Sequence, residues 1–75
     1  MDRIPVSSTN IGSVGYDEST QTLEISFVPR KDGKISIYQY ANVPMDVWVR
    51  LLHSPSKGGA FAEFIKGKYA STRLQ

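Results

Sequence analysis

A short segment of the chain alternates strictly between polar and apolar residues, and this alternation constrains the fold more than any other feature. In residues 22–27 the apolar side chains are Leu23, Ile25 and Phe27, and each follows a polar residue. Side chains at every second position of a strand point to the same face, so this segment predicts a β-strand buried on one side. The chain is therefore expected to build a sheet around it.

Turn-forming residues separate this strand from two others. A glycine-softened strand over residues 11–16 precedes it across the polar segment 17–21, and a strand over residues 34–40 follows it across the turn 29–33. Asp32-Gly33 favours a tight hairpin, because glycine tolerates the positive φ that such turns need. The sequence predicts a three-stranded antiparallel meander with short loops.

The third predicted strand carries large side chains on both faces. Ile35 and Ile37 lie on one face, and Tyr38 and Tyr40 lie on the other. If the isoleucine face covers the core, the opposite face presents two phenols. Either a second layer covers these tyrosines or they are partly exposed and open to a ligand.

The remaining residues predict two helices. Pro44 suits a first helical turn, and Ser54-Pro55 ends that helix because proline disfavours helical geometry in the preceding residue. Ser56 is predicted to cap a second helix, and residues 71–75 are expected to fray. Apolar positions recur at helical spacing in both segments: Val47, Trp48, Leu51 and Leu52 in the first, and Phe61, Ile65 and Tyr69 in the second.

Length and composition then limit the class of protein. The expected fold is α+β, a small three-stranded antiparallel meander packed against two C-terminal helices. With 75 residues, no cysteine and one histidine, the chain predicts a single domain over 1–75, with its core at about 6–69 and no metal or cofactor. No apolar run reaches the ~18 residues of a membrane span, so we expect a complete cytoplasmic protein.

Charge is distributed unevenly along the chain. Residues 1–28 carry one basic and four acidic side chains, a net charge of −3. Residues 29–75 carry eight basic and three acidic side chains, a net charge of +5. This asymmetry points to an anionic partner, or else belongs to a solvated surface that keeps the protein in solution.

Groups that could support catalysis are few. His53 is the only imidazole, and its place in the last turn of the first predicted helix suits a cation that complements the helix dipole. Ser54 or Ser56 could pair with Lys57, but nothing in the sequence activates the lysine. The carboxylates at 17–18 are adjacent in a turn, so they diverge. The sequence predicts a protein that is not an enzyme and has no catalytic residues.

The segment Ser56-Lys57-Gly58-Gly59 has the composition of an anion site at the start of a helix. It combines a hydroxyl, an ammonium group and two glycines whose amides a phosphate could approach closely. The spacing is not that of a Walker motif. The alternative is a serine cap followed by glycines that tight packing between the two helices requires.

Four tyrosines form a second candidate set: Tyr16, Tyr38, Tyr40 and Tyr69. Tyrosines on a sheet face can stack on bases while neighbouring Lys and Arg side chains bind the phosphates. In a small protein they can equally be core residues whose hydroxyl reaches water.

Several of these segments together resemble a known family. They are Ser7-Ser8, Ile11, Gly15-Tyr16-Asp17, Leu23–Phe27, Tyr38-Gln39-Tyr40, Val43-Pro44, Ser56-Lys57-Gly58, Phe61, Ile65 and Tyr69. Over about residues 6–69 the chain is similar to the KTSC domain, with Tyr-x-Tyr followed by Val-Pro as the best-known mark. That family occurs at the C-terminus of some lysyl-tRNA synthetases and as stand-alone bacterial and phage proteins, and it has no established general function.

The resemblance implies, by analogy, a role near RNA or nucleotides. Stand-alone phage copies imply another class, a small inhibitor or adaptor that binds a host protein or sequesters a host nucleotide signal. The chain departs from the family pattern at Ala60 and Ala62, where the family tends to have an aromatic and a polar residue. Its turn Pro29–Gly33 also looks longer than typical and puts three basic residues on a hairpin: Arg30, Lys31 and Lys34.

The leading hypothesis is therefore a non-catalytic binding module for RNA or for a nucleotide or phosphate ligand. Tyr38 and Tyr40 would stack on bases, while Ser56 and the amides of Gly58 and Gly59 would bind phosphate. Four cations would supply positive charge: Arg50, Lys57, Lys66 and Lys68. The competing hypotheses are docking on a host protein, and a homo-oligomer in which a second copy covers the third strand.

Overall fold

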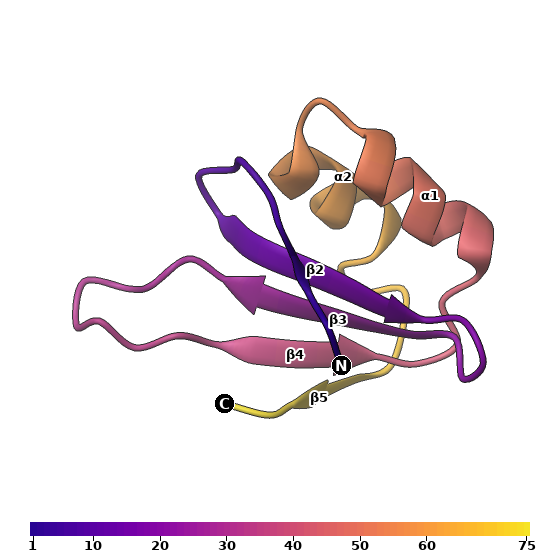
Figure 1. The fold of residues 1–75 in the computed structure, drawn as a ribbon, viewed down its shortest axis with the longest axis horizontal. Coiled ribbons are helices and arrows are strands. Elements are labelled where there is room, and N and C mark those ends of the chain that lie inside the picture. The colour runs from indigo at the N-terminus through magenta and orange to yellow at the C-terminus, as the bar shows by residue number, and fades with distance from the viewer.

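The computed structural model, which describes residues 1–75, contains one five-stranded antiparallel sheet and two helices (Figure 1). The strands lie in the sheet in chain order, so each strand pairs with the next one along the chain. Their bounds are Ile4–Pro5 (β1), Ile11–Asp17 (β2), Thr22–Phe27 (β3), Ile37–Tyr40 (β4) and Ser71–Arg73 (β5). The α+β class is confirmed.

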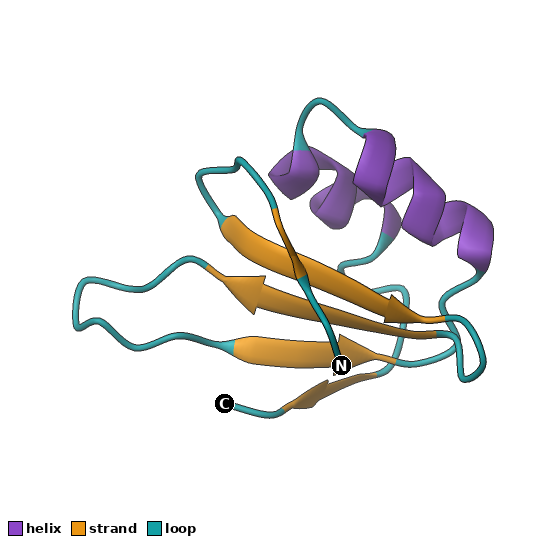
Figure 2. Ribbon diagram, viewed as in Figure 1, coloured by secondary structure: helices purple, strands orange, loops and turns teal.

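The two helices lie together on one face of the sheet, as Figure 2 shows. Helix α1 spans Met45–His53 and helix α2 spans Lys57–Phe64. Ser56 caps α2 as predicted, because its hydroxyl accepts a hydrogen bond from the Gly59 amide. Pro44 is extended and precedes α1 instead of lying within its first turn. Neither helix has the length and hydrophobicity that a membrane span requires.

The core lies between the helices and one apolar face of the sheet. Pairing of β2, β3 and β4 places Val14, Ile25 and Tyr38 in one row, with Leu23 and Tyr40 opposite each other in the next. The alternation in β3 therefore buries the side that the sequence indicates. Nine side chains form the buried core: Ile11, Val14, Leu23, Ile25, Tyr40, Val43, Leu51, Ala60 and Ile65.

The prediction of three strands is wrong, because two short edge strands complete the sheet. β1 has two residues and β5 has three, all of them exposed, which is too little for a periodic pattern to reveal. The predicted fraying of residues 71–75 is wrong for β5, which pairs with β4 and places Arg73 opposite Tyr38. The helices are therefore not C-terminal, since they connect β4 to β5.

The structure also decides which face of the third predicted strand is buried. β4 begins at Ile37 instead of residue 34, and Ile35 is 37% exposed. The tyrosines, and not the isoleucines, face the helices, because the register with β3 places Tyr38 beside the buried Ile25. A strand with large side chains on both faces does not by itself indicate which face is buried.

On the face without helices, a polar network holds the N-terminal strand. Arg3 donates to the Glu24 carboxylate, and Gln39 Nε2 donates to the same carboxylate at 2.9 Å. Glu24 is only 4% exposed, so its carboxylate is largely removed from water. The chain crosses directly over Gly15, where an added Cβ would lie 2.5 Å from the carbonyl oxygen of Asp2. Glycine at this position therefore permits the crossing.

This network predicts a loss of stability in acid. Burial would raise the pKa of the Glu24 carboxyl, but the hydrogen bonds from Gln39 and Arg3 outweigh it and hold that pKa below its ordinary value. The stabilisation is complete above the unfolded-state pKa of about 4.3 and disappears as the pH falls through the lower pKa of the folded state. We expect Glu24→Gln to lower the free energy of unfolding at pH 7 by about 2 kcal/mol.

Urea denaturation at several pH values measures this effect. The difference between the wild type and Glu24→Gln should shrink below about pH 4, where the wild-type carboxylate becomes protonated. Glu63→Gln is the matched control, because Glu63 is exposed and forms no salt bridge. An equal difference between wild type and Glu24→Gln from pH 7 to pH 2 would contradict the role of the carboxylate.

Candidate functional site

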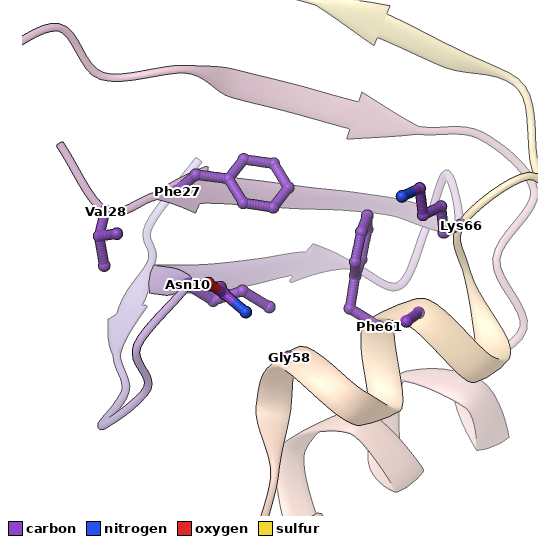
Figure 3. Close-up of a pocket in the computed structure, with 8 residues that line it drawn as sticks. Asn10, Phe27, Val28, Gly58, Phe61 and Lys66 are labelled. Atoms are coloured by element: carbon purple, nitrogen blue, oxygen red, sulfur yellow. The ribbon is translucent and has the colours of Figure 1, made fainter. Parts of the chain in front are cut away.

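Two hollows meet beside the start of helix α2. One has a volume of about 350 Å³ and a mostly apolar lining, and the other has a volume of about 230 Å³ and is lined by polar residues, glycines and one proline. They share Asn10 and Gly58. Figure 3 shows the larger hollow, with Asn10 and Gly58 at one end and Lys66 at the other. We call the larger one the apolar hollow and the smaller one the polar hollow.

The polar hollow joins two loops that are far apart in the sequence. Residues 7–10 form one wall, and residues 55–59 form the other. The hydroxyl of Ser8 accepts hydrogen bonds from the amides of Asn10 and Ile11, both at 3.2 Å, which gives the first loop its shape. The Asn10 carbonyl then accepts from the Val28 amide at 2.9 Å. These bonds hold Asn10 between β2 and the end of β3.

The start of α2 supplies the donors of the polar hollow. The amide of Gly59 donates to the Ser56 hydroxyl at 3.2 Å, and the amide of Ala60 donates to the Ser56 carbonyl at 2.9 Å. Helix geometry leaves the amides of Lys57 and Gly58 without a partner in their own helix. The ammonium group of Lys57 donates to the carbonyl of Ser54, so this lysine ties α2 to the segment that follows α1.

The two glycines of α2 have separate packing roles. A Cβ on Gly58 would lie 3.0 Å from Nδ2 of Asn10, and a Cβ on Gly59 would lie 2.9 Å from the Ser56 hydroxyl. Gly59 therefore leaves room for the cap, and Gly58 leaves room for the loop before β2. The alternative prediction, that packing between the two helices requires these glycines, is not what the structure shows, because the atoms nearest to them belong to Asn10 and Ser56.

Aromatic rings form the walls of the apolar hollow. The centroids of Phe27 and Phe61 are 5.5 Å apart and their planes are 79° apart, so the two rings meet edge to face. The remaining lining residues come from four segments: Asn10, Ile11, Val28, Gly58, Ala62 and Lys66. Lys66 is exposed and forms no salt bridge. The hollow thus offers an aromatic corner with a cation at one end.

Tyr38 and Tyr40, which the sequence predicts to stack on bases, both pack against the rings of this corner. Tyr40 is 6% exposed and packs edge to face on Phe61, with 5.7 Å between the centroids. Tyr38 is half-buried and packs edge to face on Phe27 at 6.0 Å. Burial, with a smaller contribution from Tyr38, raises the pKa of the Tyr40 phenol. The placement of Tyr40 favours the alternative that it is a core residue.

The predicted cations divide between the hollows and the rest of the surface. Lys57 lines the polar hollow and Lys66 lines the apolar hollow. Arg50 lies over the ring of Phe64, with Cζ 5.7 Å from its centroid, and lines neither hollow. Lys68 is exposed and also lines neither hollow. Only two of the four predicted cations thus belong to the candidate site.

Sequence reasoning missed two residues that shape the site. Asn10 carries no local motif, and only the fold brings it to Gly58. Phe27 was assigned to the core from its alternation in β3, although it is half-buried and lines the apolar hollow. The signal that could have found Asn10 is its position just after Ser7-Ser8, a pair already noted as part of the family pattern.

The chain belongs to the KTSC domain family, whose model matches residues 7–69. Both walls of the polar hollow lie within the matched residues. A crystal structure of a KTSC domain protein from Yersinia pestis is 39% identical, with a TM-score of 0.86, and the match covers 99% of this chain and 97% of that one.

Curated relatives fall into two kinds. A lysine–tRNA ligase of Nostoc punctiforme is 41% identical over 64 residues, which are 85% of this chain. The chain spans about a tenth of the length of that ligase and of a second one from Trichormus variabilis, also 41% identical. An uncharacterized protein of Stutzerimonas stutzeri is 32% identical and matches over nearly its whole length, 90%. The KTSC domain therefore occurs both within tRNA ligases and by itself.

The Ser56 cap gives a prediction about stability. We expect Ser56→Ala to lower the free energy of unfolding by about 1 kcal/mol, because the Gly59 amide loses its acceptor. Thermal or urea denaturation measures this change. Ser71→Ala is the control, since Ser71 is exposed and its hydroxyl forms no hydrogen bond within the protein. Equal stability of the two variants would mean that the cap does not hold α2.

Proposed function

We propose that this KTSC domain is a non-catalytic binding module for RNA or a nucleotide, with the phosphate in the polar hollow. The observation that carries the proposal is the junction of the two hollows at Asn10 and Gly58. The two hollows match the two ends of a nucleotide, which has a charged, hydrogen-bonding phosphate at one end and a flat, largely apolar base at the other. The volume of the larger hollow lies in the range of small-molecule pockets.

The polar hollow suits a phosphate for electrostatic reasons. The amides of Lys57 and Gly58 lie in the first turn of α2, where the helix dipole favours an anion. Neither the lining nor the first turn of the helix contains an acidic residue. The loop at residues 7–10 adds hydroxyl and amide groups, which can donate to phosphate oxygens. A phosphate would therefore meet donors from both walls.

A basic arm next to the apolar hollow supports the RNA form of the proposal. Val28 lines the hollow, and the long loop that follows it projects beyond the sheet between β3 and β4 (Figure 1). The cations of this arm are all exposed: Arg30, Lys31 and Lys34. The phosphates of an RNA strand that extends out of the hollow could bind along this arm. The lysine–tRNA ligase relatives are named for a reaction on RNA, which agrees with this choice.

Gly58→Ala separates binding from folding. The added methyl group would lie 3.0 Å from the Asn10 amide group at the wall that both hollows share. Binding of AMP, GMP or short RNA should fall by about tenfold, which corresponds to about 1.4 kcal/mol. Thermal stability should not fall, because alanine is the better helix former and the Asn10 side chain can move. Calorimetric titration and a melting curve measure the two effects.

Val49→Gly is the stability control, because Val49 lies within α1, is exposed and lines neither hollow. This variant should lower the free energy of unfolding by roughly 0.5 kcal/mol and leave the binding of phosphate and nucleotides intact. If the wild type binds no nucleotide, RNA or inorganic phosphate, the proposed function is wrong. Partner binding that is insensitive to Gly58→Ala and to salt would instead favour the protein-docking alternative.

The basic arm predicts a difference between RNA and mononucleotides. Replacing Arg30, Lys31 and Lys34 by Gln should weaken the binding of a single-stranded RNA hexamer and reduce its dependence on salt concentration. The affinity for a mononucleotide should change little, because one phosphate does not reach the arm. Fluorescence anisotropy between low and high salt measures both slopes. An unchanged salt dependence for the RNA would remove the arm from the binding surface.

A further inference from the structure

Three features of the candidate site follow one another along α2. Gly58 lies at the start of the helix beside Asn10, Phe61 lies next, and Lys66 follows the end of the helix (Figure 3). The shared wall at Asn10 and Gly58 separates the polar hollow from the aromatic corner. This inference rests on the proposed function. A phosphate in the polar hollow would direct the rest of the nucleotide past Asn10, toward Phe61 and Lys66.

The aromatic corner can hold one base but cannot sandwich it. Phe27 and Phe61 contact each other at nearly a right angle, so a base cannot enter between their rings. It can stack on one ring and touch the edge of the other, which are the two favoured aromatic geometries. Tyr38 and Tyr40 pack against these rings from the core side and keep them in place.

Asn10 can contact the part of the nucleotide between the phosphate and the base. Its backbone is held by the Ser8 hydroxyl and by the Val28 amide. Its side-chain amide forms no hydrogen bond within the protein, so one donor group and one acceptor are free at the shared wall. Ribose hydroxyls can both donate and accept, and they match this group.

Lys66 can contact the far edge of the base. Its backbone amide donates to the Phe61 carbonyl at 2.9 Å, which holds the residue at the end of α2. Its ammonium group has no carboxylate partner. Guanine presents two acceptors, O6 and N7, on one edge, and lysine is one of the side chains that bind them. Adenine places an amino donor beside N7, so it would meet the ammonium group with a second donor.

We propose that the apolar hollow selects guanine over adenine in the bound nucleotide, with Lys66 as the residue that determines this specificity. The proposed ligand is a guanine nucleotide, either free or as an unpaired nucleotide of an RNA. The apolar walls supply affinity for any base, whereas the cation at their end distinguishes the two purines.

Calorimetric titrations with GMP, AMP and ribose 5-phosphate test this proposal. The wild type should bind GMP about tenfold more tightly than AMP, within the range for one specific base contact. Lys66→Met should abolish this ratio, and Lys66→Arg should keep it. Lys68→Met, two residues away and outside both hollows, should leave the ratio unchanged. Melting curves verify that each variant folds.

Two RNA hexamers, five uridines followed by either G or A, distinguish the sources of the ligand. A preference for G in the hexamers alone supports an RNA nucleotide, and a preference for GMP alone supports a free nucleotide. Equal binding of GMP and AMP, together with equal binding of the two hexamers, would overturn the guanine proposal and leave the phosphate site standing. A preference for AMP, or one for GMP that survives in Lys66→Met, would also overturn it. No binding of any ligand would overturn both proposals.

Discussion

The packing of Phe61 against the sheet is the interaction on which the candidate site depends. Phe61 contacts Phe27 of β3 and Tyr40 of β4 edge to face, so it joins α2 to both strands. This contact fixes the position of α2 over the sheet. Because the helix start moves with the helix, the same contact also places Gly58 beside Asn10. The aromatic core and the polar hollow are thus parts of one arrangement.

The two faces of the sheet stabilise the fold in different ways. The helix side buries apolar and aromatic side chains, whose burial provides most of the driving force in a small domain. The other side has no helix over it, and there Arg3 and Gln39 surround the Glu24 carboxylate. The N-terminal strand is therefore held by its pairing with β2 and by hydrogen bonds to a buried carboxylate, whereas the helices are held by the core.

Local patterns predicted those elements whose signal is contained in adjacent residues. The alternation in residues 22–27 indicated β3, and Ser56 indicated the start of α2. The edge strands carried no such signal, because β1 and β5 are short and are defined by pairing with a neighbour. The inward face of β4 was likewise undecided, since both of its faces carry large side chains. Of the candidate site, the sequence indicated residues 56–59 but not the loop opposite them.

By itself, the sequence determined the α+β class, the family and the residues that start α2, because each of these depends on a local pattern or on a motif. Only the tertiary structure decided that Asn10 faces Gly58 and that Lys66 stands at the end of an aromatic corner. It also decided that Tyr40 supports this corner from the core instead of meeting a ligand. The reason is physical: these contacts join residues far apart in the sequence, 48 positions for Asn10 and Gly58 and 21 for Tyr40 and Phe61. Their geometry is set by strand register and helix packing, which no local spacing encodes.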